Sequence, residues 1–106
     1  MKIESDFNLV QNVENENYDI DYGEIKKGSD TKVLIKFSDA NHISVSKSCG
    51  CTMPIINLTQ EDVFYLIIEY DNQKIGSISQ VVWETILNDK NEEKIITLNL
   101  KGNIVE

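Results

Sequence analysis

Short runs in which apolar and polar residues alternate fill most of the sequence and predict β-strands. In Lys32–Phe37 the apolar side chains Val33, Ile35 and Phe37 would share one face, with lysines on the other. The same reasoning predicts strands at Ile43–Val45, Val63–Tyr70, Ser77–Leu87 and Lys94–Ile104, and a weaker first strand around Phe7, Leu9 and Val13. The uneven spacing of that first run indicates a bulge or a break.

The faces of these runs separate core residues from outward ones. Val63–Tyr70 is apolar on both faces, as a central strand would be. On a single face we expect Ile43 with Val45, then Ile78 with Val82 and Ile86, and finally Ile96 with Leu98 and Leu100. Val81 and Trp83 fall on the other face of their strand. Trp83 and Tyr65 are expected in the core, with an exposed apolar patch as the alternative.

Turn-forming residues separate the runs. They lie at Tyr22–Gly23, Lys27–Asp30, Ser38–Asn41, Asp71–Gln73 and Asn88–Asn91, and Thr59–Asp62 is expected to be a loop or a single helical turn. Strands at such short spacing, without an amphipathic helix, predict an all-β, immunoglobulin-like β-sandwich of about seven to nine strands. With 106 residues and one core, residues 1–106 should form a single domain.

Charge then excludes several classes of partner. The chain has 18 acidic and 10 basic residues, a formal net charge of -8, and Lys26–Lys27 as its only short basic cluster. Nucleic-acid binding requires a basic surface, so nucleic acid is not expected as a partner. No apolar run approaches membrane-spanning length, and the first residues do not resemble a secretory signal. The sequence therefore predicts no membrane partner and a reducing, cytoplasmic setting.

The two cysteines lie in the string Ser48, Cys49, Gly50, Cys51 and Thr52, followed by Pro54. A Cys-x-Cys disulfide would be strained, and a zinc site would need two more ligands where the chain has a single histidine, His42. A nucleophilic thiol would need an activating base, which His42 alone could supply. The favoured interpretation is structural: two small buried residues at a sharp bend, with Gly50 giving backbone freedom.

This string also carries a family resemblance. Together with Tyr22-Gly23-Glu24-Ile25, Glu69-Tyr70-Asp71, Ile75-Gly76-Ser77-Ile78 and the segment from Leu98 to Ile104, it resembles a large family of uncharacterised bacterial immunoglobulin-like domains. The resemblance covers residues 18–105. That family is related in fold to major sperm protein and to hydin-type domains, which are structural or adaptor modules. The resemblance therefore implies a sandwich without enzymatic activity.

Three departures from the family pattern change the expected setting. The usual Asn-x-Gly turn reads Ser38-Asp39-Ala40-Asn41, and the usual Pro-Gly turn is replaced by Thr59–Asp62. The leader peptide common in the family is not recognisable, so the cell envelope is not the expected location.

Catalysis is not expected. The carboxylates fall in turns and on polar faces, and the sequence contains no phosphate-binding glycine loop, serine elbow or metal-spaced histidine pair. We therefore expect no catalytic residue, no metal, no cofactor and no small-molecule substrate.

A non-enzymatic interaction module is the predicted class, because a sandwich offers edge strands and loops to a rigid partner. The favoured hypothesis is a bacteriophage virion accessory protein, such as a capsid-decorating protein, whose partner is a capsid or other virion protein. Immunoglobulin-like modules recur in such roles. The alternative is a cytoplasmic adaptor that binds a bacterial protein or filament. The candidate contact residues are Phe7, Leu9, Val13, Ile104 and Val105, with ordinary burial as the other interpretation.

Overall fold

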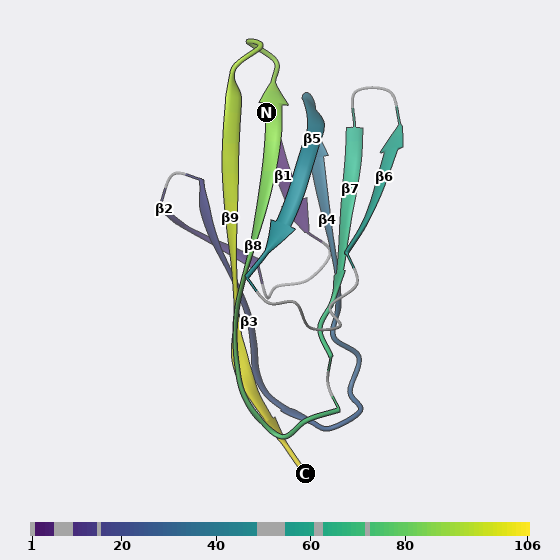
Figure 1. Cartoon of the computed structure of the whole chain (residues 1–106), viewed down its shortest axis with the longest axis vertical. Helices are drawn as coiled ribbons and strands as arrows, with labels where there is room; N and C mark the ends of the chain where they lie inside the picture. Colours follow the sequence, from purple (N-terminus) through teal and green to yellow (C-terminus); the bar gives the residue numbers. More distant parts are fainter. Residues whose placement is uncertain (1, 6–9, 15, 49–54, 61–62, 72) are drawn as a thin grey trace.

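The computed structural model describes residues 2–5, 10–14, 16–48, 55–60, 63–71 and 73–106, and within them nine β-strands form two sheets (Figure 1). The strands are β1 (Lys2–Ser5), β2 (Val10–Glu14), β3 (Asn17–Lys26), β4 (Lys32–Ser38), β5 (Ala40–Lys47), β6 (Ile55–Gln60), β7 (Val63–Glu69), β8 (Gly76–Asn88) and β9 (Glu93–Val105). The predicted all-β sandwich is confirmed.

The order of the strands explains how the two sheets are connected. One sheet has the order β1-β4-β7-β6 and the other β2-β3-β9-β8-β5. The first corresponds to the ABED sheet of a constant-type immunoglobulin domain, and β5, β8 and β9 correspond to its C, F and G strands. β2 and β3 add two strands to the second sheet, where β3 runs parallel to β9. This order agrees with the predicted immunoglobulin-like arrangement.

The core lies between the sheets and takes its residues from both. The alternating faces predicted for β4, β8 and β9 point inward as expected, and the largest fully buried side chains include Phe37, Phe64, Ile20, Ile35, Leu66, Ile68, Ile86, Ile96, Leu98, Leu100 and Ile104. Phe37 and Phe64 are register partners on β4 and β7, and their rings stack with centroids 4.4 Å apart. Burying each such side chain contributes about 2 kcal/mol.

A predicted turn is instead a strand irregularity. Tyr22 and Gly23 lie inside β3, where the pairing with β9 shifts register between Asp21 and Glu24. Gly23 adopts a φ of 63°, which favours glycine. Across from it, a Cβ on Gly102 would lie 2.8 Å from the Gly23 carbonyl oxygen. The turn prediction was wrong because a glycine bulge and a turn share the same residue signal.

A second irregularity changes the predicted face of β5. The register with β8 shifts between His42 and Ser44, so Ile43 is 47% exposed while Val45 packs against the core. The two residues therefore do not share a face. A predicted loop is also partly strand, because Thr59 and Gln60 pair with β7.

Of the weak first run, only Val13 lies within the described residues, on β2. β1 pairs with β4, whereas β2 pairs with β3 and has a register shift between Asn12 and Glu14. The register shift in β2 agrees with the bulge, one of the two predicted alternatives.

Hydrogen bonds that involve Tyr22 and Tyr70 stabilise one end of the sandwich, the end opposite the β8–β9 turn. Tyr22 donates its hydroxyl proton to the Thr31 carbonyl oxygen at 2.9 Å, and the Thr31 hydroxyl donates to the Tyr70 carbonyl at 2.6 Å. Burial raises the pKa of the Tyr22 hydroxyl, so it remains a proton donor. The two tyrosine rings lie 6.5 Å apart, which ties β3 to the end of β7.

Candidate functional site

Ser48 is the only member of the cysteine motif that the structure describes; Cys49–Thr52 lie outside the described residues. Its backbone N–H donates to the Val81 carbonyl, and its hydroxyl accepts from the Val81 N–H at 2.9 Å and donates to Gln80 Oε1 at 2.7 Å. These bonds continue the β5–β8 ladder beyond Lys47. Ser48 is therefore a structural residue that ends a strand.

His42 is held by a partner that the sequence analysis missed. Its Nδ1 is hydrogen-bonded to Glu84 Oε1, and its ring packs edge-on against Phe64 with centroids 5.8 Å apart. Glu84 lies on β8 with no exposed side-chain surface, whereas a quarter of the His42 side chain remains accessible. The pair thus links the interior of the five-stranded sheet to β7 of the opposite sheet.

Burial controls the charge of this pair. It raises the pKa of the Glu84 carboxyl to about 7, and the hydrogen bond and charge of His42 oppose that rise. Glu84 Oε2 is buried and has no hydrogen-bond partner. The Glu84 carboxyl is therefore more easily protonated than an exposed glutamate.

A signal for Glu84 was present in the sequence. Glu84 is two residues from Val82 and two from Ile86, so on an alternating strand its side chain points to the same buried face of β8. A lone acidic residue at a core position requires a partner, and His42 is the single histidine of the chain. Pairing β5 with β8 would have brought the two together.

The surroundings of the pair show whether it could belong to a metal site. In the described part of the chain, no three His, Cys, Asp or Glu side chains are grouped to hold a metal ion. A hollow of about 260 Å³ lies where β5 begins. It is lined by Asp39–Asn41 and Asn88–Asp89, not by His42. His42 is engaged by a buried carboxylate and an aromatic ring, which is typical of a structural polar pair.

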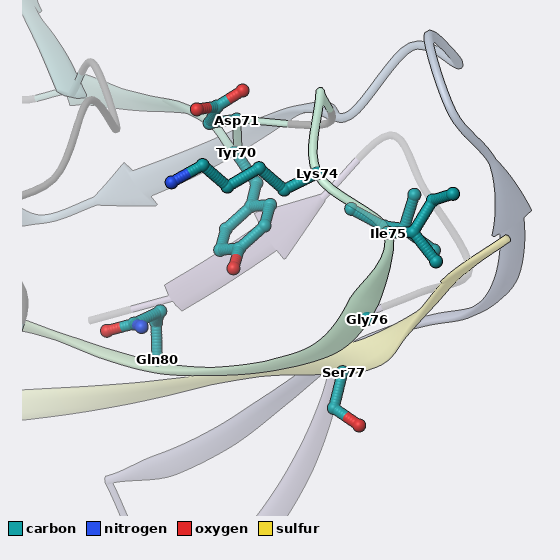
Figure 2. Close-up of a pocket in the computed structure, with 8 residues that line it drawn as sticks. Tyr70, Asp71, Lys74, Ile75, Gly76, Ser77 and Gln80 are labelled. Carbon is teal, nitrogen blue, oxygen red and sulfur yellow. The ribbon is translucent and has the colours of Figure 1, made fainter.

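A larger cavity lies where β7 leads into β8 (Figure 2). It measures about 330 Å³, and its lining includes Tyr70, Asp71, Lys74, Ile75, Ser77 and Gln80. Figure 2 shows Ile75 and Ser77 pointing away from Tyr70 and Lys74, so these side chains do not converge on a common point. Ligand sites of this size need convergent polar groups, so this cavity is a weak candidate.

The five predicted contact residues have different positions in the structure. Phe7 and Leu9 lie outside the described residues, and Val13 lies on β2, with no description of its side chain. Ile104 is 1% exposed and belongs to the core, so its prediction as a contact was wrong: β9 is central and turns this residue inward. Val105, next to it, is partly exposed.

The outward side of β7 carries a row of apolar residues. Val63, Tyr65 and Ile67 alternate with the buried residues of that strand, and Leu34 lies beside Ile67 on β4. All four side chains are partly exposed and point away from the sandwich interior. We call these four residues the β7 outer face. Antiparallel sheets usually direct polar residues to solvent, so an apolar row there indicates a contact surface.

Trp83 lies on the opposite outer surface of the molecule. It is partly buried on β8, between Ser46 and Thr97 of the neighbouring strands. Trp83 and Tyr65 are therefore both outward residues, contrary to the expectation that they belong to the core.

The edge strands differ in how they are protected from further pairing. β1 carries Lys2 and Glu4, and both β2 and β5 contain a register shift. β6 has neither feature: its sequence Ile-Ile-Asn-Leu-Thr-Gln is uncharged, and its register with β7 is continuous from Ile55 to Gln60. Charges and bulges are the usual means of blocking an edge, so among the described edges β6 is the open one.

Comparisons with known proteins add no family to these observations. No protein-family model matches the chain, and searches of curated proteins and of solved structures found no match. In the described residues, no helix is long and apolar enough to cross a membrane.

Proposed function

We propose that this chain is a non-enzymatic module that binds another protein, and that it serves as an accessory protein of a bacteriophage particle, such as a capsid-decorating protein. The observation that carries the proposal is the β7 outer face, whose apolar residues lie on the outside of the four-stranded sheet. A rigid sheet presents such a surface to a partner with little loss of conformational entropy.

The residues beside the β7 outer face suggest the chemistry of the partner surface. Lys36 is the register partner of Tyr65, so an apolar patch with an acidic residue opposite Lys36 is the best match.

The test is mass spectrometry of purified virions from the phage that encodes this chain. The proposal expects the chain in the particle at a fixed ratio to the major capsid protein. It also expects a Tyr65→Lys variant to be lost from particles, because the substitution places a charge in the apolar contact. Thr85→Lys, on the outer face of the other sheet, is the matched control and should be retained.

Absence of the wild-type chain from purified particles would overturn the virion role. Specific, Tyr65-dependent binding to a host protein or filament would then favour the cytoplasmic adaptor instead.

A further inference from the structure

We propose that two copies of this chain associate through their β6 strands, in antiparallel orientation about a two-fold axis at Asn57, to form one continuous eight-stranded sheet. This inference goes beyond the proposed function and does not depend on it. It rests on three observations: the open edge, the absence of charged residues in β6, and the Asn57 side-chain amide, whose Nδ2 has no hydrogen-bond partner.

The edge is geometrically available. β6 pairs with β7 on one side, and in Figure 1 it forms the right-hand margin of the molecule, with no described element beyond it. An edge strand presents a row of backbone N–H and C=O groups that another extended strand can satisfy. Six residues in unbroken register give a segment of ordinary strand length.

The second copy is favoured because β6 is compatible with itself. Antiparallel pairing about Asn57 sets Ile55 of one chain opposite Thr59 of the other, so neutral residues face neutral residues over residues 55–59. The net charge of -8 comes from residues outside β6, and screening over about 8 Å at physiological salt weakens their repulsion.

Asn57 supplies the specific element. Its Oδ1 accepts a hydrogen bond from the Thr59 hydroxyl at 3.0 Å, while its Nδ2 is buried without a partner. A two-fold axis at this position sets each amide opposite its own copy. After a side-chain rotation, which would break no bond of Nδ2, each nitrogen can donate to the oxygen of the other chain.

The pairing would also stop at two copies. The far edge of the same sheet is β1, a four-residue strand that carries Lys2 and Glu4. That edge opposes addition of a further strand, so the assembly closes as a dimer. The dimer would place two β7 outer faces on one side of a single sheet.

Sedimentation equilibrium of the purified chain tests the inference. The wild type should reach twice the chain mass of 12.1 kDa with increasing concentration. Asn57→Asp keeps the side-chain size and sets two carboxylates about 5 Å apart at the axis. At neutral pH this repulsion should weaken association roughly a hundredfold. Below about pH 4 the carboxyls are protonated and the dimer should return.

Ser46→Asp is the matched control, because it adds the same charge at an exposed position of β5, a different edge. It should dimerise like the wild type. Hydrogen exchange of the wild type gives a readout that needs no variant: the amides of residues 55–60 should become more protected as concentration rises, while those of β1 should not. A wild type that stays monomeric, or a dimer without protection in β6, would overturn the inference.

Discussion

The two sheets of the sandwich depart from the usual polarity pattern in opposite ways. The four-stranded sheet is apolar where it meets solvent, through the β7 outer face, and its edge strand β6 is uncharged. The five-stranded sheet places one acidic residue on its otherwise apolar core face, because Glu84 is fully buried there with His42. An acidic residue inside costs stability unless it is paired, and an apolar row outside is unusual on an antiparallel sheet.

The contrast also shows how an apolar run should be interpreted. Val63–Tyr70 was predicted to be a central strand because both of its faces are apolar, and β7 does lie between β4 and β6. One of its faces nevertheless points out of the molecule. Two apolar faces therefore do not by themselves show that a strand is buried on both sides.

The largest expected effect tests the division between the two faces of β7. Phe64→Ala should lower the free energy of unfolding by about 4 kcal/mol, because Phe64 is fully buried and stacks on Phe37. Tyr65→Ser, one residue along on the outer face, should cost less than about 1 kcal/mol. Urea denaturation measures both. Equal losses would show that the outer face belongs to the fold rather than to a contact surface.

The next effect concerns the buried pair of the five-stranded sheet. His42→Leu leaves the Glu84 carboxylate buried without its partner, so it should cost about 3 kcal/mol at pH 8. At pH 5 the carboxyl is protonated and the loss should be smaller. Asn41→Ala, at the exposed neighbouring position, is the control. A loss that is the same at both pH values would mean that His42 acts through packing alone.

A smaller effect isolates the proton on Glu84. Its pKa is raised from 4.5 to about 7 on folding, so the folded state binds this proton more tightly than the unfolded state does. The contribution of Glu84 to stability is therefore complete below about pH 4.5 and declines until about pH 7. Glu84→Gln removes that decline, and its stability relative to the wild type should improve by up to about 3 kcal/mol across this range.

Thermal unfolding followed by circular dichroism at a series of pH values measures this difference. Glu93→Gln makes the same substitution at an exposed position and should follow the wild-type curve. A Glu84→Gln variant with the wild-type pH dependence would argue against a buried, protonatable carboxyl.

The smallest effect lies on the polar outer face of the five-stranded sheet. Lys101 Nζ lies 2.7 Å from Asp19 Oδ2, and about half of the lysine side chain is exposed. The nearby carboxylate raises the pKa of the Lys101 amine, but surface ion pairs contribute little to stability. Lys101→Ser should leave the melting temperature unchanged. A clear decrease would mean that this face also depends on specific contacts.

Much of the fold could be predicted from periodicity, because a buried face imposes its two-residue repeat on the sequence. Val33, Ile35 and Phe37 were placed correctly in this way. β3 and β6 were missed for different reasons: a glycine bulge at Gly23 imitates a turn, and the polar residues Thr59 and Gln60 imitate a loop. An edge strand needs little apolar character, so its sequence is less constrained.

The candidate site was predicted less well, because its elements depend on which strands are neighbours. Glu84 and His42 are 42 residues apart, and only the pairing of β5 with β8 brings them together. Likewise, the sequence of β6 shows that it is uncharged, but its place at an edge follows from the topology of the whole sheet.

The position of β9 has a consequence for the order of events during synthesis. β9 is the last strand along this sequence, yet it lies between β3 and β8 and pairs with both. While a ribosome is still translating residues 93–105, β3 has no partner on that side and one edge of β8 is exposed to solvent. The five-stranded sheet can therefore close only once this segment has left the exit tunnel, which makes folding late and slow relative to a domain built from local hairpins.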